Sequence, residues 1–334
     1  MMTDIKKESI NTKYAVMLAI LSVIASLVSS VLGPENLIVS LLPMAVSAGL
    51  LASLIHFECI DTKLPKILAP AIIITVDWVF NGFYSLLGIL IVVSALMIFL
   101  VYEQGWEKFE STIAMSIIAA VIIALVFIVI GMKNDQGLPV GEFYTNIYEQ
   151  FKNDYISYFN EIYAPVYEEM GVESISAEDI VYVLDYAVGM LISILFVTGF
   201  VMIGIATKLY SFVLGRLGSD KDKLRAWRLS PSSIFAYFYA IVELLSMFLS
   251  GELTTYNLSI SNLSMIFMVI FWYMGIVAIG KLIRERKKRG LPILLTVVCA
   301  AFITVVFPRI VSYAGVFYCI VTNKIKKMKD DHIE

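Results

Sequence analysis

The sequence predicts an all-α, polytopic membrane protein: a transmembrane helical bundle of eight to ten spans with one acidic, tyrosine-rich amphipathic helical loop outside the membrane. Apolar residues make up 59% of the 334 residues and charged residues only 16%. The apolar residues gather in two long blocks, 14–130 and 180–323. A water-soluble globular chain of this length carries more charge, so lipid is the expected solvent for most of the protein.

Each apolar segment is read as a helix by its length. Residues 14–32 form 19 consecutive positions without a charge, about 28 Å of helix and enough for a bilayer core. Asn81-Gly82 and Pro308-Arg309 interrupt two further blocks, 66–102 and 291–323, each of which is too long for one span and short for two. Eight or nine spans therefore stay open beside ten. The expected spans are 14–32, 37–55, 66–81, 83–102, 111–132, 182–206, 232–250, 261–281, 291–306 and 308–323.

The basic residues predict the orientation of these spans. With the N-terminus inside, 22 of the 25 Lys and Arg residues fall in cytoplasmic segments, and the exceptions are Lys133, Lys152 and Arg309. Lys and Arg near span ends favour the cytoplasm. We therefore expect a multi-pass protein of the plasma membrane with both termini cytoplasmic.

Residues 133–181 form the one substantial loop, with ten acidic residues against two lysines. Within it, aromatic and apolar residues recur every three or four positions from Tyr144 to Ile162, the period of an amphipathic helix. We expect this helix to lie on the outer surface of the bundle, while a partner-binding coiled coil and a substrate lid stay open. The chain then comprises an N-terminal membrane half (1–132), an extracytoplasmic helical loop (133–181), a C-terminal membrane half (182–323) and a cytoplasmic tail (324–334).

Motifs of common active sites are missing from the sequence. It has no HExxH and no GxSxG, and His56-Phe57-Glu58 lacks the downstream PCxxC of a zinc deaminase. Gly275–Lys281 resembles the start of a P-loop, but Leu282 stands where a Ser or Thr would bind the metal. We therefore expect no enzyme activity, no metal and no cofactor. The topology explains the basic loops, so no nucleic acid is expected either.

Polar residues inside the spans are the candidate ligand-binding residues, because charge at membrane depth is costly and usually functional. Glu243 lies near the middle of the seventh span, and Arg309 is one candidate partner for it. Asp77 and Asn81 are four residues apart and share a helix face beside Trp78. This group suits a small-molecule site near the outer face. The alternative is that Asp77 and Asn81 satisfy the backbone broken at Asn81-Gly82.

The first span carries a face of small residues spaced four and three apart. Small faces let helices approach closely in lipid. This face either packs within the molecule or docks another membrane subunit. The candidate docking residues are Ala15, Ala19, Ser22 and Ser26.

Three stretches carry a resemblance to a known family: Ala15-x-x-x-Ala19 with Gly33-Pro34, Met170-Gly171-Val172 before the Ser176–Asp179 helix start, and Trp227-Arg228-Leu229-Ser230-Pro231. On these the chain resembles the YybS-type family of bacterial integral membrane proteins, which is distantly similar to the S subunits of energy-coupling-factor vitamin transporters. In S subunits an AxxxA motif docks the coupling subunit, and the resemblance implies that role for Ala15 and Ala19. S subunits typically have six spans and no long acidic loop, so no vitamin pocket is implied.

Three functional hypotheses follow. The first is a substrate-binding subunit of a transporter, in which Asp77, Trp78 and Asn81 contact a small molecule and a coupling subunit with ATPases docks on the first span. The second is a non-transporting scaffold or regulatory protein of the cell envelope that works through the acidic loop. The third is a proton-coupled carrier that uses Glu243. In each case membrane lipid surrounds the protein.

Overall fold

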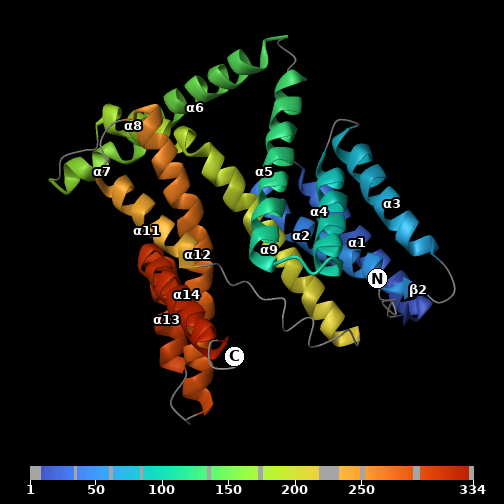
Figure 1. Cartoon of the computed structure of the whole chain (residues 1–334). Coiled ribbons are helices and arrows are strands. Elements are labelled where there is room, and N and C mark those ends of the chain that lie inside the picture. The colour runs from blue at the N-terminus through green and yellow to red at the C-terminus, as the bar shows by residue number, and fades with distance from the viewer. Residues whose placement is uncertain are drawn as a thin grey trace. The chain divides into compact units, whose positions relative to one another are not determined.

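A computed structural model describes residues 9–33, 36–59, 63–82, 86–133, 137–171, 176–217, 233–248, 253–288 and 294–330 (Figure 1). Helices form almost all of this part of the chain, which confirms the all-α prediction. The exception is a two-residue parallel pair, in which Ser9 of β1 (Ser9–Ile10) lies opposite Glu58 of β2 (Glu58–Cys59).

The chain divides into two compact units. Unit 1 comprises Met1–Leu184 and Ile194–Leu229, and unit 2 comprises Asp185–Ser193 and Ser230–Glu334. The helices of unit 1 are α1 (Thr12–Leu32), α2 (Leu37–His56), α3 (Leu64–Asn81), α4 (Leu87–Glu103), α5 (Lys108–Met132), α6 (Val140–Ile162), α7 (Ala164–Glu169) and most of α8 (Ala177–Gly189) and α9 (Leu191–Leu217). Those of unit 2 are α11 (Ser233–Phe248), α12 (Thr255–Lys288), α13 (Leu294–Val306) and α14 (Pro308–Asp330).

Six helices in the described residues are long and apolar enough to cross a membrane, which confirms a polytopic helical protein. They are α1, α2, α3, α5, α9 and α12. The count is below the predicted eight to ten for two reasons. The apolar helices α4 and α11 have only 17 and 16 residues, about 25 Å of helix against a core of about 30 Å. Segments of α13 and α14 qualify only together, as a pair bent by 106°.

The breaks predicted from the sequence lie where helices end. Gly82 follows α3 with φ of 83°, a backbone conformation that favours glycine. Pro308 begins α14 directly after α13. The sixth predicted span, 182–206, is instead two helices, because α8 ends at Gly189 and α9 starts at Leu191.

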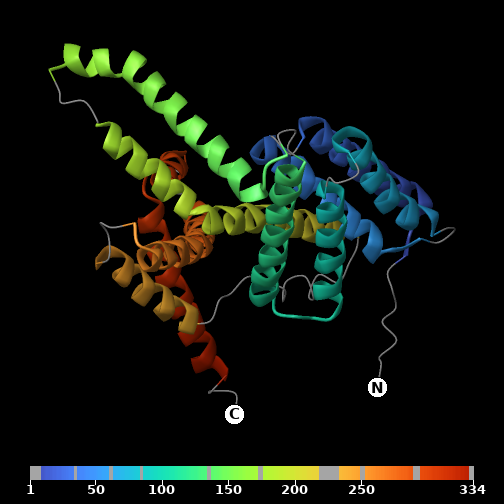
Figure 2. The same cartoon turned by 90° about the horizontal axis from the view of Figure 1, so that it is seen from above.

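Unit 1 has one apolar core, to which α1, α2, α3, α4, α5 and α9 contribute. Figure 2 shows α4 beside α5, and α2 packs against both α1 and α4. Glycines allow the closest approaches: a side chain at Gly49 would meet the carbonyl oxygen of Ala206 at 2.7 Å, and one at Gly199 would meet that of Ser116 at the same distance. These small positions let α9 pack directly on α2 and α5.

Helix α6 is amphipathic and mostly exposed, as its sequence period predicts. The hydroxyl of Tyr144 donates to the carbonyl oxygen of Phe127, so the first turns of α6 are fixed to the last turns of α5. Burial at this joint raises the pKa of Tyr144. Farther along, Phe151, Tyr155 and Tyr158 expose an aromatic stripe.

Unit 2 is built on close packing of α12 against α14, which lie side by side in Figure 1. Gly275 of α12 faces the backbone of Val311, and Gly315 of α14 faces the backbone of Phe271. Neither position has room for a side chain, so the two helices meet backbone to backbone. Tyr239 of α11 stacks on Phe271 with ring centroids 5.2 Å apart and completes this core.

Candidate functional site

Asp77 and Asn81 lie together as predicted, but their polar atoms bond to each other and to the backbone. One carboxylate oxygen of Asp77 accepts from the side-chain amide of Asn81 at 2.9 Å. The other accepts from the backbone N–H of Gly88, in the first turn of α4, at 2.8 Å. Asp77 is fully buried and Trp78 is half-buried. The carboxylate thus caps α4 across the Asn81-Gly82 break, which is the structural alternative that the sequence left open.

The small-residue face of α1 packs inside unit 1. Ala15, Ser22 and Ser26 are buried and Ala19 is partly buried against the core. The hydroxyl of Ser47, on α2, donates to the carbonyl oxygen of Ser22 at 2.8 Å. This close contact between α1 and α2 is the intramolecular role of the face.

Glu243 lies at the centre of a polar cluster in unit 2. Its carboxylate is 2% exposed and accepts a hydrogen bond from the hydroxyl of Ser264, on α12. Nε of Arg309 lies 3.3 Å from Oε1 of Glu243, so the structure pairs the two residues that the sequence suggested as partners. The hydroxyl of Tyr313 lies 3.4 Å from the same oxygen. We call Glu243, Ser264, Arg309 and Tyr313 the Glu243 cluster.

A second layer of hydroxyl groups supports this cluster. The hydroxyl groups of Tyr239 and Ser312 are 3.0 Å apart. Ser312 donates to the carbonyl oxygen of Arg309 at 2.8 Å. Arg309 is therefore oriented through its backbone as well as by the carboxylate.

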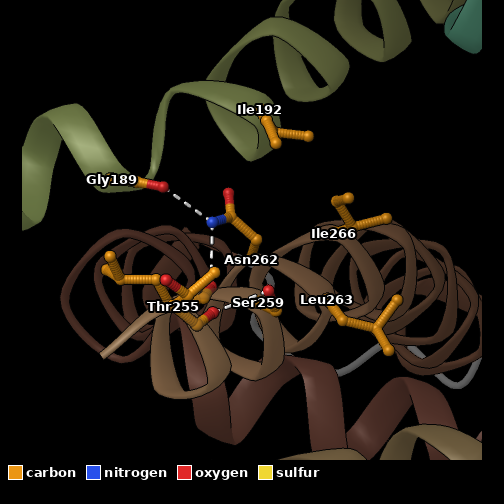
Figure 3. Close-up of a pocket in the computed structure, with 8 residues that line it drawn as sticks. Gly189, Ile192, Thr255, Ser259, Asn262, Leu263 and Ile266 are labelled. Carbon is orange, nitrogen blue, oxygen red and sulfur yellow. Dashed lines mark hydrogen bonds between the residues drawn. The ribbon is translucent and has the colours of Figure 1, made fainter. Parts of the chain in front are cut away.

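A groove of about 410 Å³ lies where the break between α8 and α9 meets α12 (Figure 3). We call it the α12 groove. Its polar atoms come from Asn262 and from the hydroxyl groups of Thr255 and Ser259, and no ionisable side chain lines it. Its apolar walls are formed by Ile192, Leu258, Leu263 and Ile266.

Asn262 connects the broken helix to α12 (Figure 3). Its amide nitrogen donates to the carbonyl oxygens of Gly189 and Leu258, both at 2.8 Å. Its carbonyl oxygen accepts from the backbone N–H of Ser193 at 2.9 Å. The side chain thus satisfies a carbonyl group before the break and an N–H group after it, which would otherwise lack helical partners.

The sequence reading missed both Asn262 and a second polar group around His56. Nδ1 of His56 lies 3.0 Å from a carboxylate oxygen of Glu103 and 3.1 Å from the hydroxyl of Tyr210. Tyr210 also lies edge-on to Tyr102. The signal for this group is weak, because Tyr210 lies 154 positions from His56 in the chain. No cluster of three metal-binding side chains occurs within the described ranges.

Comparison with known proteins yields one family. A family model described as "Predicted membrane protein (DUF2232)" matches residues 61–317. This match covers α3 to α13 and the first turns of α14, and so includes Asp77, the α12 groove and the Glu243 cluster. No curated protein and no solved structure matches the chain.

Proposed function

This chain belongs to the DUF2232 family of predicted membrane proteins, and we propose that it is the small-molecule-binding subunit of a membrane transporter. The observation that carries the proposal is the α12 groove beside the broken helix α8–α9. Many transporters bind substrate where a membrane helix is interrupted and the free backbone lines a cavity, and here the interruption lies at the beginning of α9, one of the six candidate spans. The resemblance to S subunits points to the same class.

The lining of the groove suggests the ligand class. Four apolar side chains surround the hydroxyl groups of Thr255 and Ser259, while the amide of Asn262 is taken up by hydrogen bonds to the backbone. Such a site suits an uncharged molecule that is largely apolar and carries a few hydrogen-bonding groups. We assign the ligand to the α12 groove and not to Asp77 and Asn81, because the groove is an open cavity whereas Asp77 is fully buried and caps α4.

We assign ATP hydrolysis to a separate coupling subunit with ATPases, because this sequence carries no nucleotide-binding motif. The candidate docking residue Ala15 is fully buried in the core of unit 1, so leucine there would disturb the core and would not test docking. Met17, Ile20 and Ile24 lie on the exposed side of α1 and are the better surface to substitute. A coupling subunit should then be lost from Met17→Ser, Ile20→Ser and Ile24→Ser variants purified in mild detergent.

Ligand binding is tested with full-length protein in lipid nanodiscs, incubated with a total small-molecule extract of the cells that make it. Bound molecules are identified by native mass spectrometry. Leu263→Trp fills the groove, whereas Leu282→Trp introduces the same side chain on the same helix at an exposed position away from it. We expect the molecule on the unsubstituted protein and on Leu282→Trp, but not on Leu263→Trp. Equal occupancy of both variants would remove the groove as the site.

A scaffold or regulatory role in the cell envelope is the second candidate, and the exposed aromatic stripe of α6 favours it. Phe151, Tyr155 and Tyr158 provide a surface that a protein partner could cover. Deleting 141–164 separates the two ideas. A scaffold should lose its envelope partner in co-purification, whereas a transporter subunit should keep the molecule bound at the α12 groove.

A further inference from the structure

Helix α6 follows a membrane span and carries an exposed aromatic stripe. Helix α5 is one of the six candidate spans, and α6 is the next helix in the chain. In both overall views α6 begins at the end of α5 and extends away from it (Figures 1 and 2). Along α6, Phe151, Tyr155 and Tyr158 are 53%, 42% and 52% exposed. Ile162 is exposed as well and continues the line. A line of large apolar side chains left open in this way indicates an interaction surface.

Tyr144 shows which way the first turns of α6 face. Its hydroxyl donates to the carbonyl oxygen of Phe127, and a side chain at Gly131 would meet its ring at 2.7 Å. The face of α6 that carries Tyr144 is therefore turned toward the last turns of α5. Phe127 lies five residues before the end of α5, about 8 Å along the helix axis. The beginning of α6 thus lies at the depth where α5 leaves the membrane.

The aromatic stripe lies on the same face of α6 as Tyr144. From Tyr144 the chain reaches Phe151, Tyr155, Tyr158 and Ile162 in steps of seven, four, three and four residues. At 3.6 residues per turn, these side chains fall within about 60° around the helix axis. The face that contacts α5 therefore continues as the stripe, and the stripe is turned to the membrane side of α6.

Carboxylates border the stripe and limit the kind of lipid that it fits. Asp154 and Glu161 are exposed on its edge, each three residues after an aromatic residue of the stripe. The one lysine of the helix, Lys152, is paired with Glu149 at 2.6 Å. An acidic border repels anionic headgroups and attracts the ammonium group of a zwitterionic headgroup, which the faces of tyrosine rings also attract.

We propose that the aromatic stripe of α6 binds the headgroup layer on the side of the membrane where α5 ends, and that it selects zwitterionic phospholipids. Phe151 lies at the boundary of the acyl chains, and the two tyrosine rings lie at headgroup level with their hydroxyl groups toward water. Asp154 and Glu161 meet the ammonium groups of the lipid. This surface is separate from the α12 groove. A protein partner and a second copy of this chain are the competing occupants of the stripe.

Fluorescence quenching by lipids measures whether the stripe touches the headgroups. The three native cysteines are replaced by serine, and Tyr158→Cys or Asn160→Cys is labelled with a fluorophore in zwitterionic nanodiscs that hold one protein each. Asn160 is the matched control, because it is exposed two residues farther along on the opposite, polar face. Nitroxide groups on the lipid headgroups should quench the label severalfold more strongly at Tyr158→Cys than at Asn160→Cys.

Equal quenching at the two positions would overturn the proposal. Quenching between labels that appears only when two copies share a nanodisc would also overturn it, and would assign the stripe to a second copy. Protection of Tyr158→Cys from quenching only in native membranes would assign the stripe to a protein partner.

Selection of the headgroup is tested with Tyr158→Cys in nanodiscs of phosphatidylcholine or phosphatidylglycerol. We expect severalfold weaker quenching in the anionic lipid, because the acidic border is repelled. Asp154→Asn combined with Glu161→Gln should abolish this difference. Glu142→Gln combined with Glu149→Gln changes the charge of α6 equally on the face away from the stripe, and should preserve the difference. The same response to lipid charge in both double variants would contradict selection by the border.

Discussion

The sequence allowed two roles for the carboxylate of Asp77, a ligand contact or a partner for the broken backbone, and only its contacts in the structure distinguish them. Sequence spacing placed Asp77 and Asn81 on one face beside a helix break, and that placement is correct. What the spacing could not give is the acceptor role toward Gly88, because it depends on how α3 and α4 pack. The role of Asn262 could not be predicted for the same reason, because its partners Gly189 and Ser193 are about seventy positions away in the sequence.

The cap formed by Asp77 makes a prediction for stability. In Asp77→Ala the N–H of Gly88 loses its acceptor while the site stays buried. An unsatisfied buried donor costs about 1–3 kcal/mol, and we expect a loss of this size in chemical unfolding in detergent. Asp154→Ala, at an exposed position of α6, should change stability little. A stable Asp77→Ala protein that no longer binds a small molecule would instead restore Asp77 as a ligand contact.

Loss of the Asn262 side chain should lower the stability of the protein more than loss of the Asp77 carboxylate. Asn262→Ala leaves the carbonyl of Gly189 and the N–H of Ser193 without their partner, at about 1–3 kcal/mol for each group. Ser259→Ala is the matched control, because Ser259 lines the same groove but bonds only to Thr255 of its own helix. Thermal unfolding in nanodiscs should show a clearly lower midpoint for Asn262→Ala. Similar midpoints for the two variants would mean that Asn262 does not hold the break together.

At the scale of elements, the boundaries of most helices could be predicted from apolar length and from glycine and proline. How closely two helices pack could not be predicted, since Gly275 and Gly280 look alike in the sequence. The structure separates them: Gly275 faces the backbone of Val311, whereas a side chain at Gly280 would meet nothing within 4 Å. The division of 182–206 into α8 and α9 was missed for a similar reason, because a single glycine within an apolar run does not reveal that another helix supplies the lost hydrogen bonds.

These two glycines give a matched pair of substitutions. Gly275→Ala forces α12 away from α14 and should destabilise the protein by about 1–3 kcal/mol, the usual cost of overpacking. Gly280→Ala removes the flexibility of glycine from an open helix position and should stabilise by roughly 0.5–1 kcal/mol. Chemical unfolding in detergent measures both. Effects of the same sign would contradict the backbone-to-backbone contact of α12 and α14.

At the scale of the whole molecule, the number of crossings is linked to the distribution of charge. Eight helices cross the membrane if α4 and α11 do so as well as the six long helices. The total number of crossings then depends on the pair α13–α14. A single crossing by that pair would make nine and would leave the four lysines of the tail outside. The basic residues therefore favour an even number, with α13 and α14 either both crossing or re-entering the membrane at the bend.

We therefore expect both termini to lie on one side of the membrane and the acidic segment on the other. With the three native cysteines replaced, single cysteines are introduced as Thr3→Cys, Asn153→Cys and His332→Cys. A membrane-impermeant maleimide applied to intact cells should label Asn153→Cys alone, and all three after the membrane is permeabilised. Labelling of His332→Cys in intact cells would mean an odd number of crossings, in which the bent pair α13–α14 forms one span against the charge rule.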